Sequence, residues 1–523
     1  MLFLKDIKIK IAFPFLLILS SLTCAFAGDA ILFTVLHTND HHGAYWQDSK
    51  GQGGLVNRLA LIENIRKETE NKGGFVLLLD AGDVNTGTPE SDLMMAEPDF
   101  KGMAKLGYDA MTLGNHEFDN PLSTLKRQQL WAGFPFLSAN IYMKGSDKRV
   151  FSPYQLFERK GLKIGVFGLT TIQTKTVGSK KILADLDFRS HTSEAQKAIA
   201  EMRAENPDII IGLTHLGYYP DGHYGSNAPG DITLARELMP GSVDMLIGGH
   251  SHTAVCMQAN KLSVTWKEDK VCQPDRQNGT LIFQALESGK YLGRADFTWQ
   301  DGKLTLNSYQ LLPVEEVMEP SPAVKAVSTW LGSYKSQSDK QLLSPLASLN
   351  EPYIGNRDEV RNHQTNMGRL IIEAQMDKTG ADFGIISSGS IRSSIDAGIV
   401  SYRDILKVQP FGNTVTYVDM TGQEVMDYLQ VILTKTPGSG AYAQYHNISF
   451  EIKDNKVSNL KIKGVGVNPL KAYRMSLPSY NANGGDGYPE INKLSSYVNT
   501  GYIDAEVLKS YISTHYPFKN DKV

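Results

Sequence analysis

Seven side chains that could bind metal ions stand just after short apolar runs in the first half of the chain. The runs are rich in Val, Ile or Leu and bounded by Gly, Asn or Asp, as buried strands are. In an open α/β sheet, the carboxyl ends of such strands form the edge where ligands bind. The seven candidates are Asp40, His42, Asp83, Asn115, His215, His250 and His252.

These candidates offer oxygen and imidazole nitrogen, and no thiolate. Such a mixed set suits Zn, Mn, Co or Fe better than Ca, Mg or an iron–sulfur cluster. Seven ligands are too many for one tetrahedral ion but fit two, and an aspartate can bridge a pair. Two ions about 3.5–4 Å apart can clamp a phosphate and activate water for in-line attack. The residue types therefore predict two divalent metal ions, with Zn, Mn or Co expected.

Spacing supports this interpretation in two of the motifs. Asp40 and His42 are expected on the same side of an extended segment, because side chains alternate along a strand. His250 and His252 repeat this spacing. Each motif alone is more often structural, so the prediction depends on all five strand ends occurring in one region. Seven other histidines are expected to be surface or core residues: His37, His41, His191, His223, His363, His446 and His515.

The elements that must position these residues follow an α/β pattern from Ala30 to about Glu287. A helical spacing of apolar residues from Leu55 to Ile65 separates the first two runs. This alternation predicts a layered α/β domain. The six apolar runs are 31–36, 75–79, 110–113, 164–169, 209–213 and 245–247.

The pattern changes at the Pro-containing segment 319–322. An amphipathic helix is expected over 323–342, followed by a second α/β region from about Ser344. Thr421 and Glu424 form a capping box that opens a further helix. We therefore expect a first domain over 28–322, a linker helix over 323–343 and a second domain over 344–523.

The second region carries side chains that could bind a nucleotide. Arg357 and Arg361 lie four residues apart, so one helical turn would place both on one face. Arg392 follows a Ser- and Gly-rich turn. Guanidinium groups are permanently charged and bind phosphate oxygens in a fork. Taken singly, each arginine is more often a solvated surface charge.

Two aromatic residues could recognise the base. Phe411 and Tyr480, if they face each other, could sandwich a base in a contact of about 1–3 kcal/mol. Asp486, on a Gly-rich turn, could accept both ribose hydroxyls. From the pattern alone, such aromatics are more often core residues.

Composition and the N-terminus restrict the class of protein. The 523 residues are enough for two or three domains, and the net charge of -3 leaves no large basic surface for polymeric nucleic acid. Residues 1–27 have the basic start, apolar core and Ala25–Ala27 end of a signal peptide, which predicts a periplasmic or secreted protein. Cys24 raises the possibility of lipidation, although the residues before it match a lipoprotein signal poorly. No later apolar run is long enough for a stable membrane anchor.

Cysteine usage agrees with export. Once the signal peptide is removed, only Cys256 and Cys272 remain. An even pair in an exported protein predicts one disulfide, and two free thiols are the alternative.

The motifs resemble the signature blocks of the calcineurin-like metallophosphatase superfamily, and the mature chain as a whole is similar to the 5′-nucleotidase family. This resemblance implies a four-layer α/β/β/α metallophosphatase domain and a C-terminal α/β substrate-binding domain. The blocks that carry it are Asn39–His42, Gly82–Gly87, Gly114–Asp119 and Gly248–His252 in the first region, and Arg357–Arg361, Gly389–Arg392, Gln409–Asn413 and Tyr480–Tyr488 in the second.

The resemblance also implies a role for each candidate. One ion would be bound by Asp40, His42, Asp83 and His252, and the other by Asp83, Asn115, His215 and His250. His116 would stabilise charge in the transition state, with Asp119 holding its imidazole. In the second domain, Arg357, Arg361 and Arg392 would hold phosphate, Phe411 and Tyr480 would stack on the base, Asn413 and Gly440 would line the base pocket, and Asp486 would hold the ribose.

Two positions depart from the family pattern. His252 stands where some family members carry Gln and others carry Asn or His. Imidazole can bind the same ion, so activity is expected to persist, while metal preference and exchange rate are left open. Tyr480 stands where Phe is usual, which keeps the ring face and predicts a modest change in base preference.

The expected activity is hydrolysis of 5′-nucleotides, and of UDP-sugars to UMP and sugar 1-phosphate, by a monomer. Domain rotation, as in the family, would open and close the substrate site. Action on 2′,3′-cyclic nucleotides remains an alternative. Action on cysteine-carried sulfur is disfavoured by the base-stacking pair, and a non-enzymatic nucleotide receptor by the complete set of ligands.

Overall fold

The computed structural model describes residues 30–177, 182–219, 229–258, 261–262 and 272–516. The expected signal peptide, with Cys24 and the cleavage site after Ala27, lies outside these residues, as does His223. Within the described ranges, no helix is both long and apolar enough to cross a membrane.

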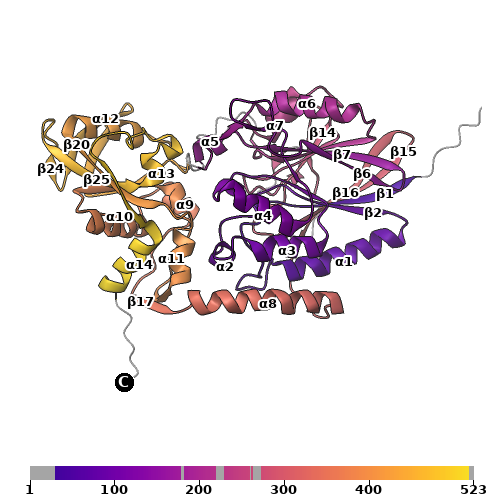
Figure 1. Ribbon diagram of the computed structural model, residues 1–523, viewed down its shortest axis with the longest axis horizontal. Helices are drawn as coiled ribbons and strands as arrows, with labels where there is room; N and C mark the ends of the chain where they lie inside the picture. The colour runs from indigo at the N-terminus through magenta and orange to yellow at the C-terminus, as the bar shows by residue number, and fades with distance from the viewer. Residues whose placement is uncertain (1–29, 178–181, 220–228, 259–260, 263–271, 517–523) are drawn as a thin grey trace, which may run out of the picture.

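Two six-stranded sheets form the N-terminal part (Figure 1). In the first, β1, β2, β3 and β4 are parallel and two antiparallel strands extend one edge. Its order is β16 (Lys303–Pro313), β15 (Tyr291–Gln300), β1 (Ile31–Thr38), β2 (Phe75–Asp80), β3 (Ala110–Thr112) and β4 (Phe136–Leu137). The second has the order β13 (Asp275–Gln277), β14 (Thr280–Phe283), β10 (Met245–Ile247), β9 (Ile209–His215), β7 (Leu162–Thr170) and β6 (Tyr154–Arg159), with β14, β10, β9 and β7 parallel.

Strand alternation explains why these sheets stack face to face. On β2, Leu77 and Leu79 enter the core between the sheets, whereas Leu78 packs under the helices on the outer face. On β9, Ile211 lies between the sheets and Ile210 lies under the opposite helices. Figure 1 shows α6 (His191–Arg203) and α7 (Asp231–Glu237) above the sheets, and α1 (Leu55–Asn71), α3 (Glu97–Leu106) and α4 (Leu122–Ala132) below them. The expected α/β/β/α layering is confirmed.

The strands that carry the candidate ligands divide between the two sheets. β1, β2 and β3 belong to one sheet and β9 and β10 to the other. The motif pattern alone suggested the edge of an open sheet. The ligand-bearing strand ends instead meet where two stacked sheets end together.

The helix predicted over 323–342 is confirmed as α8 (Pro322–Leu342). The Ser321 side chain accepts a hydrogen bond from the Val324 amide at 3.2 Å, and Pro322 occupies the first turn, so the helix begins with a stable cap. It packs against α1 and α3 of the N-terminal part and reaches α11 (Tyr402–Val408) of the C-terminal part.

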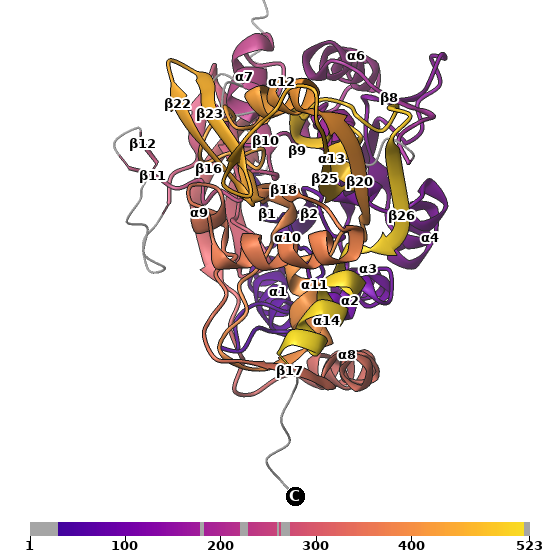
Figure 2. The same cartoon turned by 90° about the vertical axis from the view of Figure 1, so that its left-hand side faces the viewer.

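The C-terminal part is built on a five-stranded mixed sheet (Figure 2). Its order is β21 (Ala443–His446), β18 (Phe383–Ser387), β25 (Ala472–Pro478), β20 (Thr414–Thr421) and β26 (Tyr497–Ile503). One core cluster lies under α10 (Asn366–Thr379), α11 and α14 (Asp504–His515), and another lies under α12 (Gly422–Ile432) and the strands β22 (Ile448–Lys453) and β23 (Lys456–Ile462). The predicted capping box of Thr421 and Glu424 is present at α12.

The predicted disulfide is also present. Cys256 and Cys272 are bonded, with their Cα atoms 4.9 Å apart, and both are buried in the core between the sheets.

Candidate active site

The strand ends bring six of the seven metal-ligand candidates into two groups of three residues. Asp40, His42 and His252 form one group, and Asp83, His215 and His250 form another. Asp83 also forms a third group with His42 and His116, so its carboxylate lies between the other two. Of the seven residues in the three groups, four follow strands of the first sheet, namely Asp40, His42, Asp83 and His116. The other three, His215, His250 and His252, lie at the ends of strands of the second sheet.

Each of the four histidines has one ring nitrogen fixed by an oxygen acceptor. Nδ1 of His42 lies 2.8 Å from the Thr86 carbonyl, and Nδ1 of His215 lies 2.7 Å from the Ala81 carbonyl. Nε2 of His250 bonds Gln173 at 2.9 Å, and Nδ1 of His252 contacts the Glu287 carboxylate. Metal-ligating histidines are typically oriented in this way, because the bond fixes the ring and leaves the other nitrogen for the ion.

The remaining ligand atoms point at one another. Nε2 of His42 lies 3.2 Å from Nε2 of His252, and Nε2 of His215 lies 3.0 Å from Oδ2 of Asp83. Asp40 Oδ1 lies 3.3 Å from His252 Nε2. Lone pairs and carboxylates converging at these distances have the geometry of a cation site.

The seventh candidate, Asn115, provides an independent test of whether a cation fits. Its Oδ1 atom is buried and has no hydrogen-bond partner among the described residues. Buried polar atoms are nearly always satisfied, so an orphaned amide oxygen at a cluster of imidazoles and carboxylates needs a partner. A divalent cation supplies that partner, and oxygen and nitrogen donors suit Zn, Mn or Co.

The backbone at these ligands is not extended, so the prediction that each pair lies on one side of an extended segment is wrong. Asp40 and His42 both have φ of 51°, and His250 and His252 have 77° and 55°. Asp83 also has a left-handed backbone conformation, with φ of 58°. Such conformations are uncommon for non-glycine residues and concentrate at functional sites, where the surrounding structure enforces them. Tight turns, and not strand alternation, therefore make the ligand pairs converge.

Glycine is required beside the shared carboxylate. A Cβ atom at Gly114 would lie 2.1 Å from Oδ1 of Asp83. The same Oδ1 accepts a hydrogen bond from the His116 amide at 2.8 Å. The loop after β3 can approach Asp83 closely only because residue 114 has no side chain.

The buried carboxylates and imidazoles of the site shift one another's pKa values. Burial raises the pKa of Asp83, but the neighbouring His215 and His116 outweigh it and hold that pKa well below the usual range. Burial lowers the pKa of His215, but Asp83 and Asp40 outweigh it and raise the pKa to about 10. Protons thus balance the carboxylates in this arrangement, and a bound cation would take their place.

His116 and Asp119 form the predicted pair. Nδ1 of His116 lies 2.6 Å from Oδ2 of Asp119. Burial lowers the pKa of His116, but Asp119 and Asp83 outweigh it, so the net shift is upward. The ring also lies parallel to that of Phe411, 5.8 Å away, which places a residue of the C-terminal part beside the cluster.

The three predicted phosphate-binding arginines lie together in the C-terminal part. Arg357 begins α9 (Arg357–Val360) and Arg361 follows its end, which confirms the helical turn. Burial, together with the charges of Arg357 and Arg392, lowers the pKa of Arg361 to about 9. None of the three pairs with a carboxylate of the described chain. Uncompensated cations held this close form a site for an anion.

Two of the other predicted nucleotide contacts, Asp486 and Gly440, lie beside Arg361. Asp486 is buried with φ of 55°, and its amide donates to the Tyr480 hydroxyl at 3.1 Å. A Cβ atom at Gly440 would lie 3.7 Å from Arg361 Nη2 and 3.8 Å from Asp486 Oδ1. Asn413 is bonded through its carbonyl to the amide that begins α14, at 2.8 Å.

Comparisons with known proteins match both parts of the chain. Residues 33–254 match the calcineurin-like phosphoesterase family, and residues 345–493 match the 5′-nucleotidase C-terminal domain. Protein UshA of Escherichia coli is 51% identical, over 92% of this chain and 91% of its own length. The chain belongs to the 5′-nucleotidase family.

Further relatives agree with this family. A 5′-nucleotidase of Vibrio cholerae is 50% identical over 92% of this chain and 90% of its own length. The solved 5′-nucleotidase precursor from Thermus thermophilus is 28% identical with a TM-score of 0.76, covering 92% of this chain and 96% of that chain. As a 5′-nucleotidase family member, the protein is a metal-dependent phosphoesterase that hydrolyses nucleotide phosphates.

Three supporting residues of this 5′-nucleotidase were missed by sequence reasoning. Glu117 is fully buried and accepts amide hydrogens from Asp83 at 2.9 Å and Gly114 at 2.7 Å, so it joins two ligand-bearing loops. Gln173 and Glu287 orient two histidines, as described above. Glu117 lies inside a recognised motif, but nothing in the type or spacing of Gln173 and Glu287 marks them.

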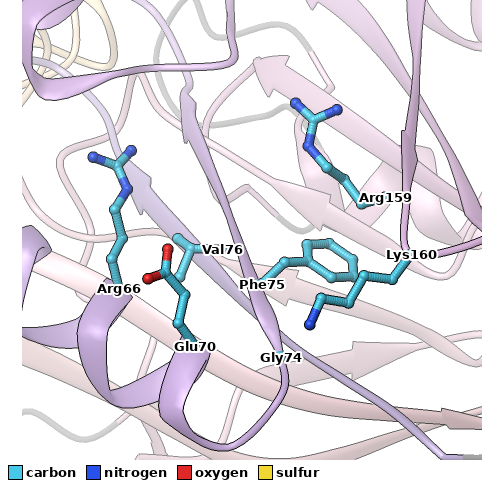
Figure 3. A pocket seen from close by; sticks show the side chains of 7 residues that line it. All are labelled: Arg66, Glu70, Gly74, Phe75, Val76, Arg159 and Lys160. Carbon is cyan, nitrogen blue, oxygen red and sulfur yellow. The ribbon is translucent and has the colours of Figure 1, made fainter.

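A separate surface pocket lies at the start of β2, at the opposite end of that strand from Asp83 (Figure 3). Arg66 and Glu70 line one side, and Arg159 and Lys160 lie across from them. It contains none of the predicted site residues, so it is not the active site of this family member.

Proposed function

We propose that the protein is an exported two-metal hydrolase that releases phosphate from 5′-nucleotides and splits UDP-sugars to UMP and sugar 1-phosphate. The observation that carries this proposal is the carboxylate of Asp83, which belongs to two of the three candidate metal groups. The N-terminal signal pattern supports export, with scavenging of phosphate and nucleosides as the purpose. We further propose that it acts as a monomer.

The grouping of six candidates and the unsatisfied Asn115 oxygen support the metal-binding roles that the family resemblance implies. We propose that Asp40, His42, Asp83 and His252 hold one ion and that Asp83, Asn115, His215 and His250 hold the other. The two cations would supply Lewis-acid charge for phosphate oxygens and lower the pKa of water. The protein contributes a fixed ring orientation at each histidine and a carboxylate between the groups.

His116 acts on the substrate in this proposal and not as a metal ligand. Its raised pKa favours the protonated ring, which cannot bind a cation but can donate from Nε2 to a phosphate oxygen. Asp119 fixes Nδ1 and therefore the direction of that donor. The charge that develops on the phosphate during attack is thereby stabilised.

Nucleotide specificity is assigned to the C-terminal part. Arg357, Arg361 and Arg392 would hold phosphate, Asp486 would hold the ribose, and Asn413 and Gly440 would line the base pocket with Phe411 and Tyr480. Substrate would have to contact both parts of the chain at once, because the metal groups and the arginines come from different parts.

Removal of the Phe411 ring is expected to weaken binding more than turnover. Loss of a stacked base costs about 1–3 kcal/mol, so Phe411→Ala should raise KM for UMP about tenfold, with kcat changed less than about threefold. Phe411→Tyr keeps the ring and should restore KM. Steady-state kinetics on UMP checks this, and an unchanged KM for the alanine variant would contradict base stacking by Phe411.

The proposed function is tested with a substrate panel. Metal-loaded protein is incubated with AMP, UMP, ATP, UDP-glucose and a 2′,3′-cyclic nucleotide, and phosphate and sugar phosphate are measured. Phosphate from AMP and UMP and glucose 1-phosphate from UDP-glucose are expected. Activity confined to the cyclic nucleotide, or absent on every 5′-nucleotide, would overturn the proposal.

A further inference from the structure

A tight turn after β9 presents Tyr219 beside the candidate metal centre. Gly217 has φ of 92°, and a Cβ atom there would lie 2.1 Å from Cε2 of Tyr219. A Cβ atom at Gly230 would lie 2.8 Å from the Tyr219 amide nitrogen. The Asp231 amide closes the turn by donating to the Gly217 carbonyl at 2.8 Å. Two glycines are thus required to hold the Tyr219 ring where it lies.

The Tyr219 ring lies against a candidate metal ligand. It stands edge-on to the imidazole of His250, with ring centroids 6.4 Å apart and an interplanar angle of 89°. Burial raises the pKa of the Tyr219 phenol to about 12, while the charges of Arg357 and Arg361 act to lower it. Tyr219 therefore contacts a candidate metal ligand and is near enough to Arg357 and Arg361 for their charges to act on its phenol.

The Tyr219 hydroxyl is available to a ligand. It forms no hydrogen bond with any residue in the described part of the chain, whereas the hydroxyl of the adjacent Tyr218 donates to Asp275 at 2.9 Å. An ordinary phenol is protonated at neutral pH and can donate a hydrogen bond. Together with Arg361, it offers complementary donors to one anion from opposite parts of the chain.

We propose that the Tyr219 hydroxyl donates a hydrogen bond to an oxygen of the substrate phosphate that Arg357 and Arg361 hold. This inference rests on the proposed function and adds a substrate-binding residue to it. The phosphate is then held from both sides, by the metal-binding part through Tyr219 and by the C-terminal part through the arginines. Contacts from both sides fix the position of the phosphorus beside the metal centre.

Tyr219→Phe removes the hydroxyl and keeps the ring. A hydrogen bond to a charged group contributes enough that kcat/KM for UMP should fall about 10- to 100-fold. Tyr218→Phe is the matched control, because its hydroxyl is directed to Asp275, and it should stay within about twofold of the parent protein. Metal content and melting temperature should be unchanged in Tyr219→Phe.

A double-mutant cycle separates phosphate binding from a structural effect. If Tyr219 and Arg361 hold the same phosphate, the losses from Tyr219→Phe and Arg361→Gln should be non-additive, whereas Tyr219→Phe and Phe411→Ala should be additive. Additive losses in the first cycle, or wild-type kcat/KM in Tyr219→Phe, would overturn the inference.

Binding of inorganic phosphate provides a readout that does not need turnover. Calorimetry with the metal-loaded protein should show weaker phosphate affinity in Tyr219→Phe than in Tyr218→Phe. If the parent protein hydrolysed no nucleotide, the proposed function would fail, yet this comparison would still decide the role of Tyr219. Equal phosphate affinity in the two variants would refute it.

Discussion

Asp83→Asn should lower kcat for UMP by about 10³-fold or more. Asp83 is the one carboxylate that lies in two of the three candidate metal groups, with Oδ2 3.0 Å from His215 Nε2 and Oδ1 accepting the His116 amide. The amide removes the negative charge between the two cations. Metal ions contribute several kcal/mol to phosphoryl-transfer catalysis, and each 1.36 kcal/mol is tenfold in rate. Metal analysis of the purified variant should show fewer than two ions per chain.

Asp80→Asn provides the matched control for this variant. Asp80 ends the same strand and is equally buried, but its carboxylate accepts from Thr38 at 2.6 Å and from the Gly82 amide at 2.9 Å. It belongs to none of the candidate metal groups. The control should retain both ions and most of its turnover. Equal losses in the two variants would mean that Asp83 acts only through general destabilisation.

His116→Ala should lower kcat by about 10²- to 10³-fold and leave KM and metal content nearly unchanged. Loss of one donor to the charge of a transition state has a cost of this size. Asp119→Asn should give a smaller loss in the same parameter, because the ring keeps its place but loses its orienting acceptor.

The alternative for His116 is also testable. It lies within ligand distance of His42 and Asp83, so it could bind a cation directly. In that case His116→Ala would lose metal along with turnover. Elemental analysis of the variant beside its kinetics therefore distinguishes a substrate contact from a metal ligand.

The sequence predicts which residues gather at the candidate metal centre because its signals are local. Each candidate ligand follows a strand whose apolar pattern is visible, and strand ends must lie at a sheet edge. The division of β1 and β9 between two sheets is not visible in this way, because a buried strand has the same apolar composition in either arrangement. The left-handed backbone at Asp40 and His250 is likewise hidden, since it depends on the surrounding packing and not on residue type.

Supporting residues were harder to predict than ligands. Glu287 and Gln173 lie in sequence far from the histidines that they orient, and their roles exist only after folding. Tyr219 is near His215 in sequence, but its significance depends on Arg361, which the second half of the chain supplies. Local motifs therefore identified the reacting groups, while contacts between distant segments determined how those groups are held.

Metal reconstitution tests the central claim most directly. The mature protein is stripped with chelator, titrated with Zn²⁺, Mn²⁺ or Co²⁺, and followed by calorimetry and UMP hydrolysis. We predict two bound ions per chain, no hydrolysis in the stripped protein, and full activity only when the second ion has bound. Hydrolysis that persists after complete stripping, or that is fully restored by a single ion, would contradict a paired metal centre around Asp83.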